Sequence, residues 1–528
     1  MAAVCAVLIL GQINFDLALP DYMSSLTVLI KTPGSTLSDI LHTGLEMLGC
    51  TLASAVLCVI CGYLTAKVAA GFSFSIREAV FHKIADFGQQ EMMTFSVPSL
   101  INRTTNDITQ VQMLTAMGLQ ILIKSPVMAV WAIIKIVGKS WTLSAITAGF
   151  VAALLVMMAV IIGVVVPRFR RVQKLTDHIN LVARENLNGI NVVHAYNAED
   201  YQNAKFWKGN EELMRTQLFN QRAFAFLMPG VTLAMNALSL VIYWVGASIV
   251  NAVPAADTAA RLAAFSDIVV FGTYATYVIM SIMMMVMIIM MLPAAQVSAQ
   301  RINEVLETRN SLTQGTRIDA LETGTVEFRD VSFKYARAGT GDDVLSQISF
   351  TVEPGQFVAI VGGTGTGKSS LVNLIPRFYD VTEGAVLLDG LDVRDYPLEQ
   401  LRARIGMVLQ SNVLFTGTIR ENLLWGRPDA TEEEMVQAAK DAQAYDFIMG
   451  LPDGFDTVLT QGGTNVSGGQ KQRLCIARAM LRKPAVLILD DSTSAVDSAT
   501  EAAIRQSFAS NLKDTTVIII AQRISSVQ

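Results

Sequence analysis

The sequence has little charge and few cysteines for its length of 528 residues. Charged residues make up only 16% of it, whereas apolar residues make up 52%. The formal net charge of −5 is small, so the charge balance indicates no nucleic-acid partner and we expect none. The five cysteines form no framework typical of secreted proteins, and the C-x-x-C pair of Cys58 and Cys61 lies in an apolar run where packing is the expected role. A chain this long and apolar is predicted to join a membrane domain to a soluble one.

Six apolar runs occupy the first 300 residues, and most match the ~20 residues that a helix needs to cross a bilayer. They are 2–19, 45–68, 113–137, 141–166, 224–250 and 268–292. The first run could be mistaken for a signal peptide. No basic segment precedes it, however, and Asp16 and Pro20 stand where the small residues of a cleavage site would be. We therefore predict six membrane spans.

Lysine and arginine are distributed unevenly between the two sides of these spans, which fixes the orientation. One side carries Lys67, Arg77, Lys83, Arg103, Arg168, Arg170, Arg171, Lys174 and Arg184. The other side has little beyond Lys31, Lys139 and Arg261. We therefore place the first side in the cytoplasm, in a cell membrane of the bacterial inner or plasma type.

The two basic connections, 68–112 and 167–222, are unusually long and rich in helix formers. Unstructured loops of that length are uncommon. We predict that the spanning helices continue well into the cytoplasm, turn and come back.

Ionisable residues at membrane depth are functional candidates, and here they are Asp16 and Lys124. Asp16 is a candidate to face a translocation path. Lys124 is expected to extend its amine to the membrane surface. The sixth span is rich in methionine, which suits an adaptable binding surface, although core or lipid contact is the expected role. These residues are Met280, Met283, Met284, Met285, Met287, Met290 and Met291.

After a polar, partly helical linker, the pattern changes to short strands. They are predicted at 325–328, 331–335, 348–352, 357–361, 385–388, 406–409, 486–489 and 517–520. The last two are nearly continuous apolar runs, as expected of parallel strands covered on both faces. The C-terminal part is therefore predicted to be an α/β domain.

A glycine-rich loop of the form G-x-x-x-x-G-K-S follows the strand at 357–361 and leads into a helix. Its residues are Gly362, Gly363, Thr364, Gly365, Thr366, Gly367, Lys368, Ser369 and Ser370. Backbone N–H groups of such a loop surround phosphates at the positive end of the helix dipole. Lys368 would neutralise the β- and γ-phosphates, and the Ser369 hydroxyl would hold Mg²⁺. The loop predicts binding of a nucleoside triphosphate.

Two further motifs follow. Ser467, Gly468, Gly469 and Gln470 precede a helix predicted at 471–482, and the apolar strand after it ends in Asp490 and Asp491. An aspartate at Asp490 can hold Mg²⁺ through water. Together with the phosphate loop and six spans, this combination resembles the ATP-binding cassette (ABC) exporters over nearly the whole chain.

The resemblance implies ATP and Mg²⁺ as cofactors and assigns roles residue by residue. Tyr335 would stack on adenine, and Gln410 would touch Mg²⁺ and the attacking water. The signature 467–470 would reach ATP held by an opposite cassette, and Asp497 would link the two sites. Segments 96–102 and 197–201 resemble coupling elements, the second of which docks on the partner's cassette in the family.

Two positions depart from the family pattern: Asp491 replaces the usual glutamate and Gln522 the usual histidine. The glutamate is a general base worth ~10²–10⁴ in rate. Aspartate is one methylene shorter, and a misplacement of about 1 Å can cost ~10². Glutamine cannot shuttle a proton. Gln461 also replaces an acidic residue ahead of the signature. The alternative is that both changes are neutral, since aspartate can also act as a base.

We therefore expect a multi-domain membrane protein: a six-helix all-α transmembrane domain with long cytoplasmic helical extensions, followed by an α/β P-loop nucleotide-binding domain. The expected boundaries are 1–300 for the spans, 301–322 for the linker and 323–528 for the cassette. Relative to the family, the chain is expected to be shortened at both ends. No elbow helix is expected before the first span.

The expected function is one half of an ATP-driven exporter of an unidentified substrate, in a lipid bilayer, paired with a second, non-identical half. This chain would contribute the degenerate site and an intact signature. The alternatives are an ATP-gated channel or regulatory subunit without productive turnover, and an importer built on the exporter scaffold.

Overall fold

The computed structural model describes residues 1–31, 35–254, 257–317, 323–335, 343–490 and 497–521. The chain divides into two compact units. The first comprises Met1–Phe81 and Ile101–Leu306, and the second comprises His82–Leu100 and Glu307–Gln528. The second unit therefore combines the C-terminal part with a short segment from the first hundred residues.

Six helical stretches among the described residues are long and apolar enough to cross a membrane, which confirms the six predicted spans. The spanning helices are α1 (Ala2–Lys31), α2 (Leu37–Ala85), α5 (Ile108–Val137), α6 (Trp141–Asn188), α9 (Leu227–Ala252) and α10 (Thr258–Glu307). The first span does not end at Leu19 as predicted, because α1 continues through Pro20. Proline is tolerated inside spanning helices, where neighbouring groups satisfy the freed backbone.

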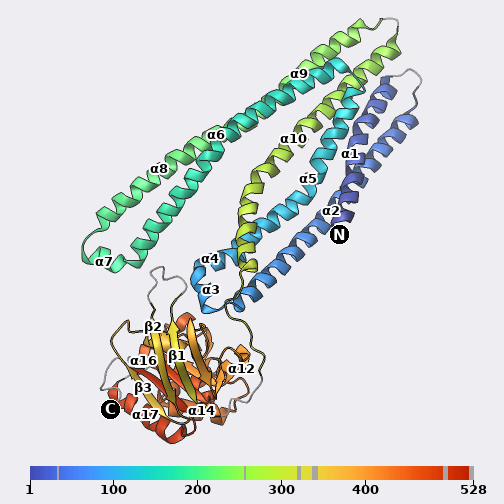
Figure 1. Ribbon diagram of the computed structural model, residues 1–528. Coiled ribbons are helices and arrows are strands. Elements are labelled where there is room, and N and C mark those ends of the chain that lie inside the picture. Colours follow the sequence, from blue (N-terminus) through green and yellow to red (C-terminus); the bar gives the residue numbers. More distant parts are fainter. Residues whose placement is uncertain (32–34, 255–256, 318–322, 336–342, 491–496, 522–528) are drawn as a thin grey trace. The chain divides into compact units, whose positions relative to one another are not determined.

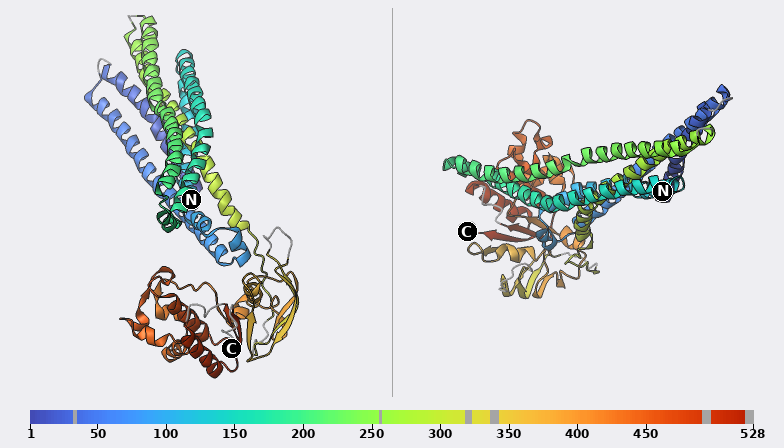
Figure 2. Two further views of the ribbon diagram at one scale, coloured as in Figure 1. Left: turned by 90° about the vertical axis from the view of Figure 1, so that its left-hand side faces the viewer. Right: turned by 90° about the horizontal axis from the view of Figure 1, so that it is seen from above.

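Both long cytoplasmic connections are helical, as predicted (Figure 1). In the first, α3 (Gln89–Thr94) and α4 (Val97–Asn102) lie between α2 and α5, so the predicted turn segment 96–102 is largely α4. In the second, α7 (Ile190–Ala195) lies between α6 and α8 (Glu199–Ala225). Figure 2 shows α6 running beside the chain that returns through α8 and α9. The predicted segment 197–201 contains the start of α8, and it begins at Asn197 with a left-handed φ of 49°.

A π-helix at Arg103–Asp107 joins α4 to α5 and is held against α10. The Arg103 guanidinium pairs with Glu304 at 2.8 Å, and the Asp107 carboxylate accepts a hydrogen bond from Ser298 at 2.9 Å. Both Arg103 and Asp107 are buried. The sequence pattern did not indicate this π-helical junction.

The core of the second unit is a parallel sheet in the order β3-β10-β9-β6. Its strands are β3 (Phe357–Val361), β10 (Thr516–Ala521), β9 (Val486–Asp490) and β6 (Ile405–Val408). All residues of β9 and β10 are buried, as their apolar runs predicted. The carboxyl ends of parallel strands meet at one edge, so the loop after β3 and the aspartate that ends β9 lie at the same edge.

An antiparallel sheet in the order β2-β1-β4-β5 covers one side of the phosphate-loop helix. Its strands are β1 (Val326–Phe333), β2 (Leu345–Val352), β4 (Glu383–Leu388) and β5 (Leu391–Asp392). The two strands predicted at 325–328 and 331–335 are one strand, β1. Its register shifts between Phe328 and Val331, where Asp330 has a φ of 48°.

Helices and short elements complete the second unit. The helices are α11 (Lys368–Asn373), α12 (Leu398–Ala403), α13 (Ile419–Leu424), α14 (Glu432–Asp441), α15 (Tyr445–Met449), α16 (Gly468–Leu481) and α17 (Ser498–Asn511). A two-stranded ribbon pairs β7 (Gly417–Thr418) with β8 (Val458–Leu459). Helices α13, α14 and α16 share a hydrophobic core with the parallel sheet. This core fixes the start of α16, which carries the signature.

Candidate functional site

The phosphate loop connects β3 to α11 through glycines whose backbone only glycine adopts readily. Gly365 and Gly367 have φ of 83° and 81°. A Cβ on Gly367 would also lie 3.0 Å from the carbonyl oxygen of Val344. Side chains other than hydrogen are disfavoured at positive φ. The loop is therefore held in the curved form that directs N–H groups toward an anion.

The Lys368 side chain lies across this loop. Its Nζ donates hydrogen bonds to the carbonyl oxygens of Gly362 at 2.8 Å and Gly363 at 2.6 Å. These bonds hold the ammonium group over the loop, where a polyphosphate would meet it. The geometry agrees with the role that the motif predicts for Lys368.

Oxygen ligands suited to Mg²⁺ converge beside the lysine. The Ser369 hydroxyl donates to the Asp490 carboxylate at 3.0 Å, although the two residues are 121 positions apart. Asp490 and Gln410 line the same cavity of about 250 Å³ as residues 364–370. Hydroxyl, amide and carboxylate oxygens are the hard ligands that Mg²⁺ prefers. The donor set therefore fits a magnesium ion bound together with phosphates.

Tyr335 lies in an aromatic cluster beside the loop rather than in the wall of that cavity. Its ring packs edge-on against Phe333 at 4.8 Å and Tyr379 at 5.2 Å between centroids. Its hydroxyl is 2.8 Å from the hydroxyl of Ser370. Burial raises the pKa of Tyr379, so this neighbour stays a neutral phenol. The cluster adds Phe333 and Tyr379 to Tyr335, the ring that the resemblance assigned, and the F-x-Y spacing at the end of β1 could have indicated Phe333.

The signature forms the N-terminus of α16. Ser467 is the N-cap: its hydroxyl accepts from the Gln470 N–H at 3.3 Å, while the Gln470 side chain accepts from the Ser467 N–H at 2.9 Å. This capping box fixes the first turn. Ser467 and Gly468 are exposed and Gly469 is half-buried, so N–H groups at the positive end of the helix are open to a ligand. Within the described part of the chain, the signature does not line the cavity of the phosphate loop.

The remaining predicted residues fall into two groups. Asp497 caps α17, and hydrogen bonds from the Thr500 N–H and hydroxyl hold the pKa of its carboxyl below the ordinary value. Gln461 is itself exposed and begins a 3₁₀ turn at Gln461–Gly463 ahead of the signature, in which Gly463 is buried. Asp491 and Gln522 lie outside the described residues. Their predicted roles therefore rest on residue type alone.

Comparison with protein families identifies both parts of the chain. Residues 3–282 match the ABC transporter transmembrane region, and residues 345–494 match the ABC transporter family. The chain belongs to the ABC transporters. An uncharacterized ABC transporter ATP-binding protein of Mycobacterium tuberculosis is 38% identical over 96% of this chain and 86% of its own length. The YfiB protein of Bacillus subtilis, also an uncharacterized ABC transporter ATP-binding protein, is 36% identical over 100% of this chain and 90% of its own length.

A relative with a named activity and a solved structure complete the comparison. The ATP-dependent lipid A-core flippase of Pseudomonas aeruginosa is 32% identical over 88% of this chain and 76% of its own. The structure of a bacterial Atm1-family ABC exporter with ATP bound has a TM-score of 0.81, covering 100% of this chain and 91% of that one at 23% identity. That likeness concerns the fold. The chain is thus an ABC exporter half-transporter, with a membrane domain and a cytoplasmic cassette that implies ATP binding and ATPase activity.

The intramembrane charges of this ABC transporter are paired with one another. The Lys124 amine lies 3.2 Å from the Asp16 carboxylate, which also accepts a 2.5 Å hydrogen bond from Ser54. The expectation that Lys124 extends to the membrane surface is therefore wrong. An ion pair inside the bundle costs less than carrying one charge alone at this depth. A second pair, Lys135 with Asp21 at 2.7 Å, also joins α5 to α1.

The pairing predicts the outcome of a double-mutant experiment. Lys124→Met leaves the Asp16 charge unpaired at membrane depth, so we expect the melting temperature of the ABC transporter in nanodiscs to fall. An unpaired charge there costs about 2.5–3.5 kcal/mol on insertion scales. Adding Asp16→Asn removes that charge and should restore most of the loss. If the double variant melts as low as Lys124→Met alone, the pair does not stabilise the bundle.

Three methionines of the sixth span lie on one exposed helical face in the single chain of this ABC transporter, whereas Met283 packs against the hydrophobic core. Met280, Met284 and Met287 recur at the spacing of one helix face and are 44%, 41% and 45% exposed. They are therefore not in the core of this unit. Whether lipid or a substrate covers them stays a prediction.

Proposed function

We propose that this chain is the degenerate-site half of a heterodimeric exporter. The supporting observation is that the two elements expected to bind ATP are separate within the chain. The phosphate loop lines one cavity, whereas the signature lies outside that cavity, at the exposed start of α16. Such an arrangement suits two composite sites, each made from one chain's loop and the other chain's signature. In this proposal the domains are 1–300, 301–322 and 323–528, as expected from the sequence.

The roles of the residues follow from the geometry. Lys368 would exchange its bonds to the loop carbonyls for phosphate oxygens, and Ser369 with Asp490 would hold Mg²⁺. Bound ATP supplies the phosphoryl group whose transfer to water drives the cycle. Gln410 lines the same cavity and would orient water. Asp491 and Gln522 would weaken base and proton-transfer chemistry at this site, so productive hydrolysis would take place at the partner's phosphate loop against Ser467–Gln470.

Segments at the tips of the cytoplasmic extensions would transmit closure of the cassettes. In the proposal, α7 and Asn197 contact the partner's cassette. An unmodified signature favours this function over an ATP-gated channel or a regulatory subunit, because a regulatory half has no need to complete a partner's hydrolytic site.

Vesicle transport separates these functions. Proteoliposomes holding the assembled pair should move substrate with MgATP and stop with a non-hydrolysable ATP analogue. Fluorescent lipids and amphipathic dyes form a suitable panel, since a relative at 32% identity is a lipid A-core flippase. Sustained flux with the analogue would establish the channel function instead. The control for ATP-independent leakage is the pair with Lys368→Ala in this chain and the corresponding phosphate-loop lysine replaced by alanine in the partner.

A further inference from the structure

Arg377 is the most unusual residue of the second unit outside the phosphate loop. It lies shortly after α11, its side chain is 1% exposed and its φ is 52°. A buried charge is tolerated only when it is paired and hydrogen-bonded. A non-glycine residue in the left-handed region persists only where its surroundings over-determine it. Both features indicate that the surrounding contacts fix the position of this guanidinium.

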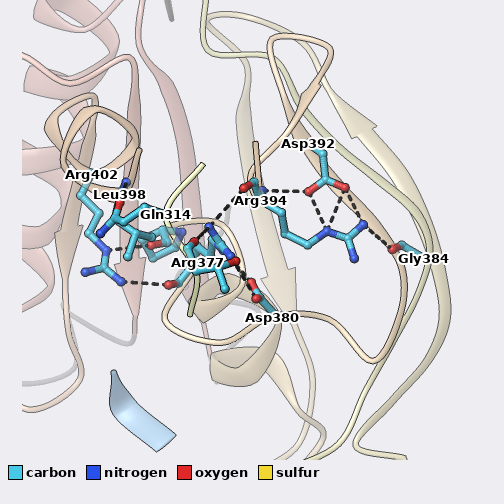
Figure 3. A network of polar contacts seen from close by, with 10 residues as sticks. Gln314, Arg377, Asp380, Gly384, Asp392, Arg394, Leu398 and Arg402 are labelled. Atoms are coloured by element: carbon cyan, nitrogen blue, oxygen red, sulfur yellow. Dashed lines mark hydrogen bonds and ion pairs between the residues drawn. The ribbon is translucent and has the colours of Figure 1, made fainter. Parts of the chain in front are cut away.

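The guanidinium joins three segments that are distant in sequence (Figure 3). It makes a two-pronged pair with the Asp380 carboxylate, at 2.6 and 3.1 Å. It also donates to the carbonyl oxygens of Thr313 at 2.8 Å and Arg394 at 3.3 Å. The backbone carbonyl of Arg377 accepts a hydrogen bond from the Arg402 side chain at 2.9 Å. The turn after α11 is thereby fastened to the segment that leaves the membrane unit.

That segment, 310–317, is bound along its whole length, and we call it the strap. The Leu398 N–H donates to the Gln314 side chain at 3.1 Å, and the Gly315 N–H donates to the Tyr396 carbonyl at 3.3 Å. A Cβ on Gly315 would lie 2.1 Å from the Asp395 carbonyl oxygen. The strap therefore lies so close to the cassette backbone that only glycine fits at this point.

The strap also binds α3, the short helix of the first cytoplasmic extension. The Ser311 N–H donates to the Glu91 carboxylate at 2.9 Å, and the Asn310 side chain donates to the Asp86 carbonyl at 2.9 Å. Met93 of α3 lies 3.6 Å from the Tyr379 hydroxyl, two residues from Arg377. Arg377 thus stands where the phosphate-loop helix, the strap and α3 converge within one compact unit.

We propose that Arg377 is a positioning residue that couples ATP at the phosphate loop to the strap and α3. A shift of α11 on phosphate binding would move the turn at Arg377, and the guanidinium would carry the strap with it. The strap follows directly on α10, so this route reaches the last membrane span through the chain itself. The inference rests on the proposed binding of ATP at Lys368, but not on the heterodimer.

Hydrogen exchange of the full chain in lipid nanodiscs, with and without MgATP, tests the coupling. In the wild type, MgATP should slow exchange in the phosphate loop, in residues 310–317 and in α3. In Arg377→Met, MgATP should still protect the phosphate loop, but protection of the strap and α3 should fall about fivefold or more, the usual range of site-to-site coupling. Arg377→Lys should recover only part of this protection, because an ammonium group cannot reproduce the two parallel hydrogen bonds of a planar guanidinium.

Two further variants test the strap itself and provide a control. Gly315→Ala displaces the strap but leaves the Arg377 side chain unchanged. It should give the same uncoupling, even if Arg377→Met fails to fold. Arg394→Met is the matched control: the side chain of this arginine donates to the Asp392 carboxylate and the Gly384 carbonyl, and among the described residues no hydrogen bond of this side chain goes to the strap. It should leave coupling unchanged.

The outcomes are distinguishable. If MgATP fails to protect the phosphate loop of the wild type, the proposed nucleotide site is wrong. If the loop is protected but the strap responds equally in wild type and Gly315→Ala, the coupling role is overturned while the nucleotide site stands. Loss of coupling in Arg394→Met to the same degree would reduce Arg377 to a general packing residue.

Discussion

Gly468→Asp in this chain should nearly abolish the steady-state ATPase of the assembled pair. Gly468 is exposed at the first turn of α16, where N–H groups and the helix dipole favour negative charge. An aspartate there places a carboxylate where the partner's γ-phosphate would bind. One preorganised donor of this kind is typically worth ~10²–10³ in rate, and the introduced carboxylate repels the phosphate charge that these N–H groups would stabilise. Ser467→Arg should be comparably severe, because it removes the cap that orders this turn.

The same assay should show a much smaller effect at the degenerate site. Asp491→Ala is expected to change the ATPase of the pair only a few-fold, because little turnover remains there to lose. Lys368→Ala should fall between the two, since it weakens ATP binding without touching the partner's base. The purified pair carries each change in this chain only. Equal severity of Asp491→Ala and Gly468→Asp would mean that the two sites are equivalent, and the asymmetric mechanism would be wrong.

The second large effect is a gain of activity. Purified without a partner, this chain should bind ATP but hydrolyse it very slowly. Asp491→Glu with Gln522→His should then raise turnover by about 10², because a base extended by one methylene reaches water and a proton-transferring group is restored. Release of phosphate at saturating MgATP measures the gain.

A control separates repaired chemistry from a contaminating ATPase. Adding Lys368→Ala to the double variant should return turnover to the background. Asp491→Glu with Gln522→Asn should gain less than the pair with histidine, since asparagine cannot accept and pass on a proton. Brisk hydrolysis by the unmodified chain alone would contradict the degenerate-site proposal.

Local patterns predicted much of the fold and which residues meet at the candidate phosphate site. The strand 357–361 agrees with β3, and the loop after it meets Asp490 across the parallel sheet, as the strand order of such sheets requires. These features depend on short sequence patterns: an apolar run, a glycine spacing and a carboxylate at a strand end. Six spans were predictable for the same reason, because each is defined by the length of a continuous apolar segment.

Features that depend on distant partners were not predictable. Lys124 was expected to reach the membrane surface because it lies near the cytoplasmic start of the third span, yet Asp16 meets it from 108 positions away. The polar stretch near Thr313 was predicted as a linker, and no pattern in it indicated that Arg377 and Gly315 hold it against the cassette. Polar composition indicates exposure only when no buried partner satisfies those groups.

The membership of α3 in the second unit has a consequence for synthesis of the chain. Glu91 and Ser311, which join α3 to the strap, are 220 positions apart. At ~5–20 residues per second, α3 is synthesised roughly 10–40 s before the strap that binds it. During that interval Glu91, 5% exposed in the finished fold, lacks the Ser311 N–H that binds it there. The nucleotide-binding unit therefore closes around a segment made long before it, so its folding is completed only after translation has passed all six spans.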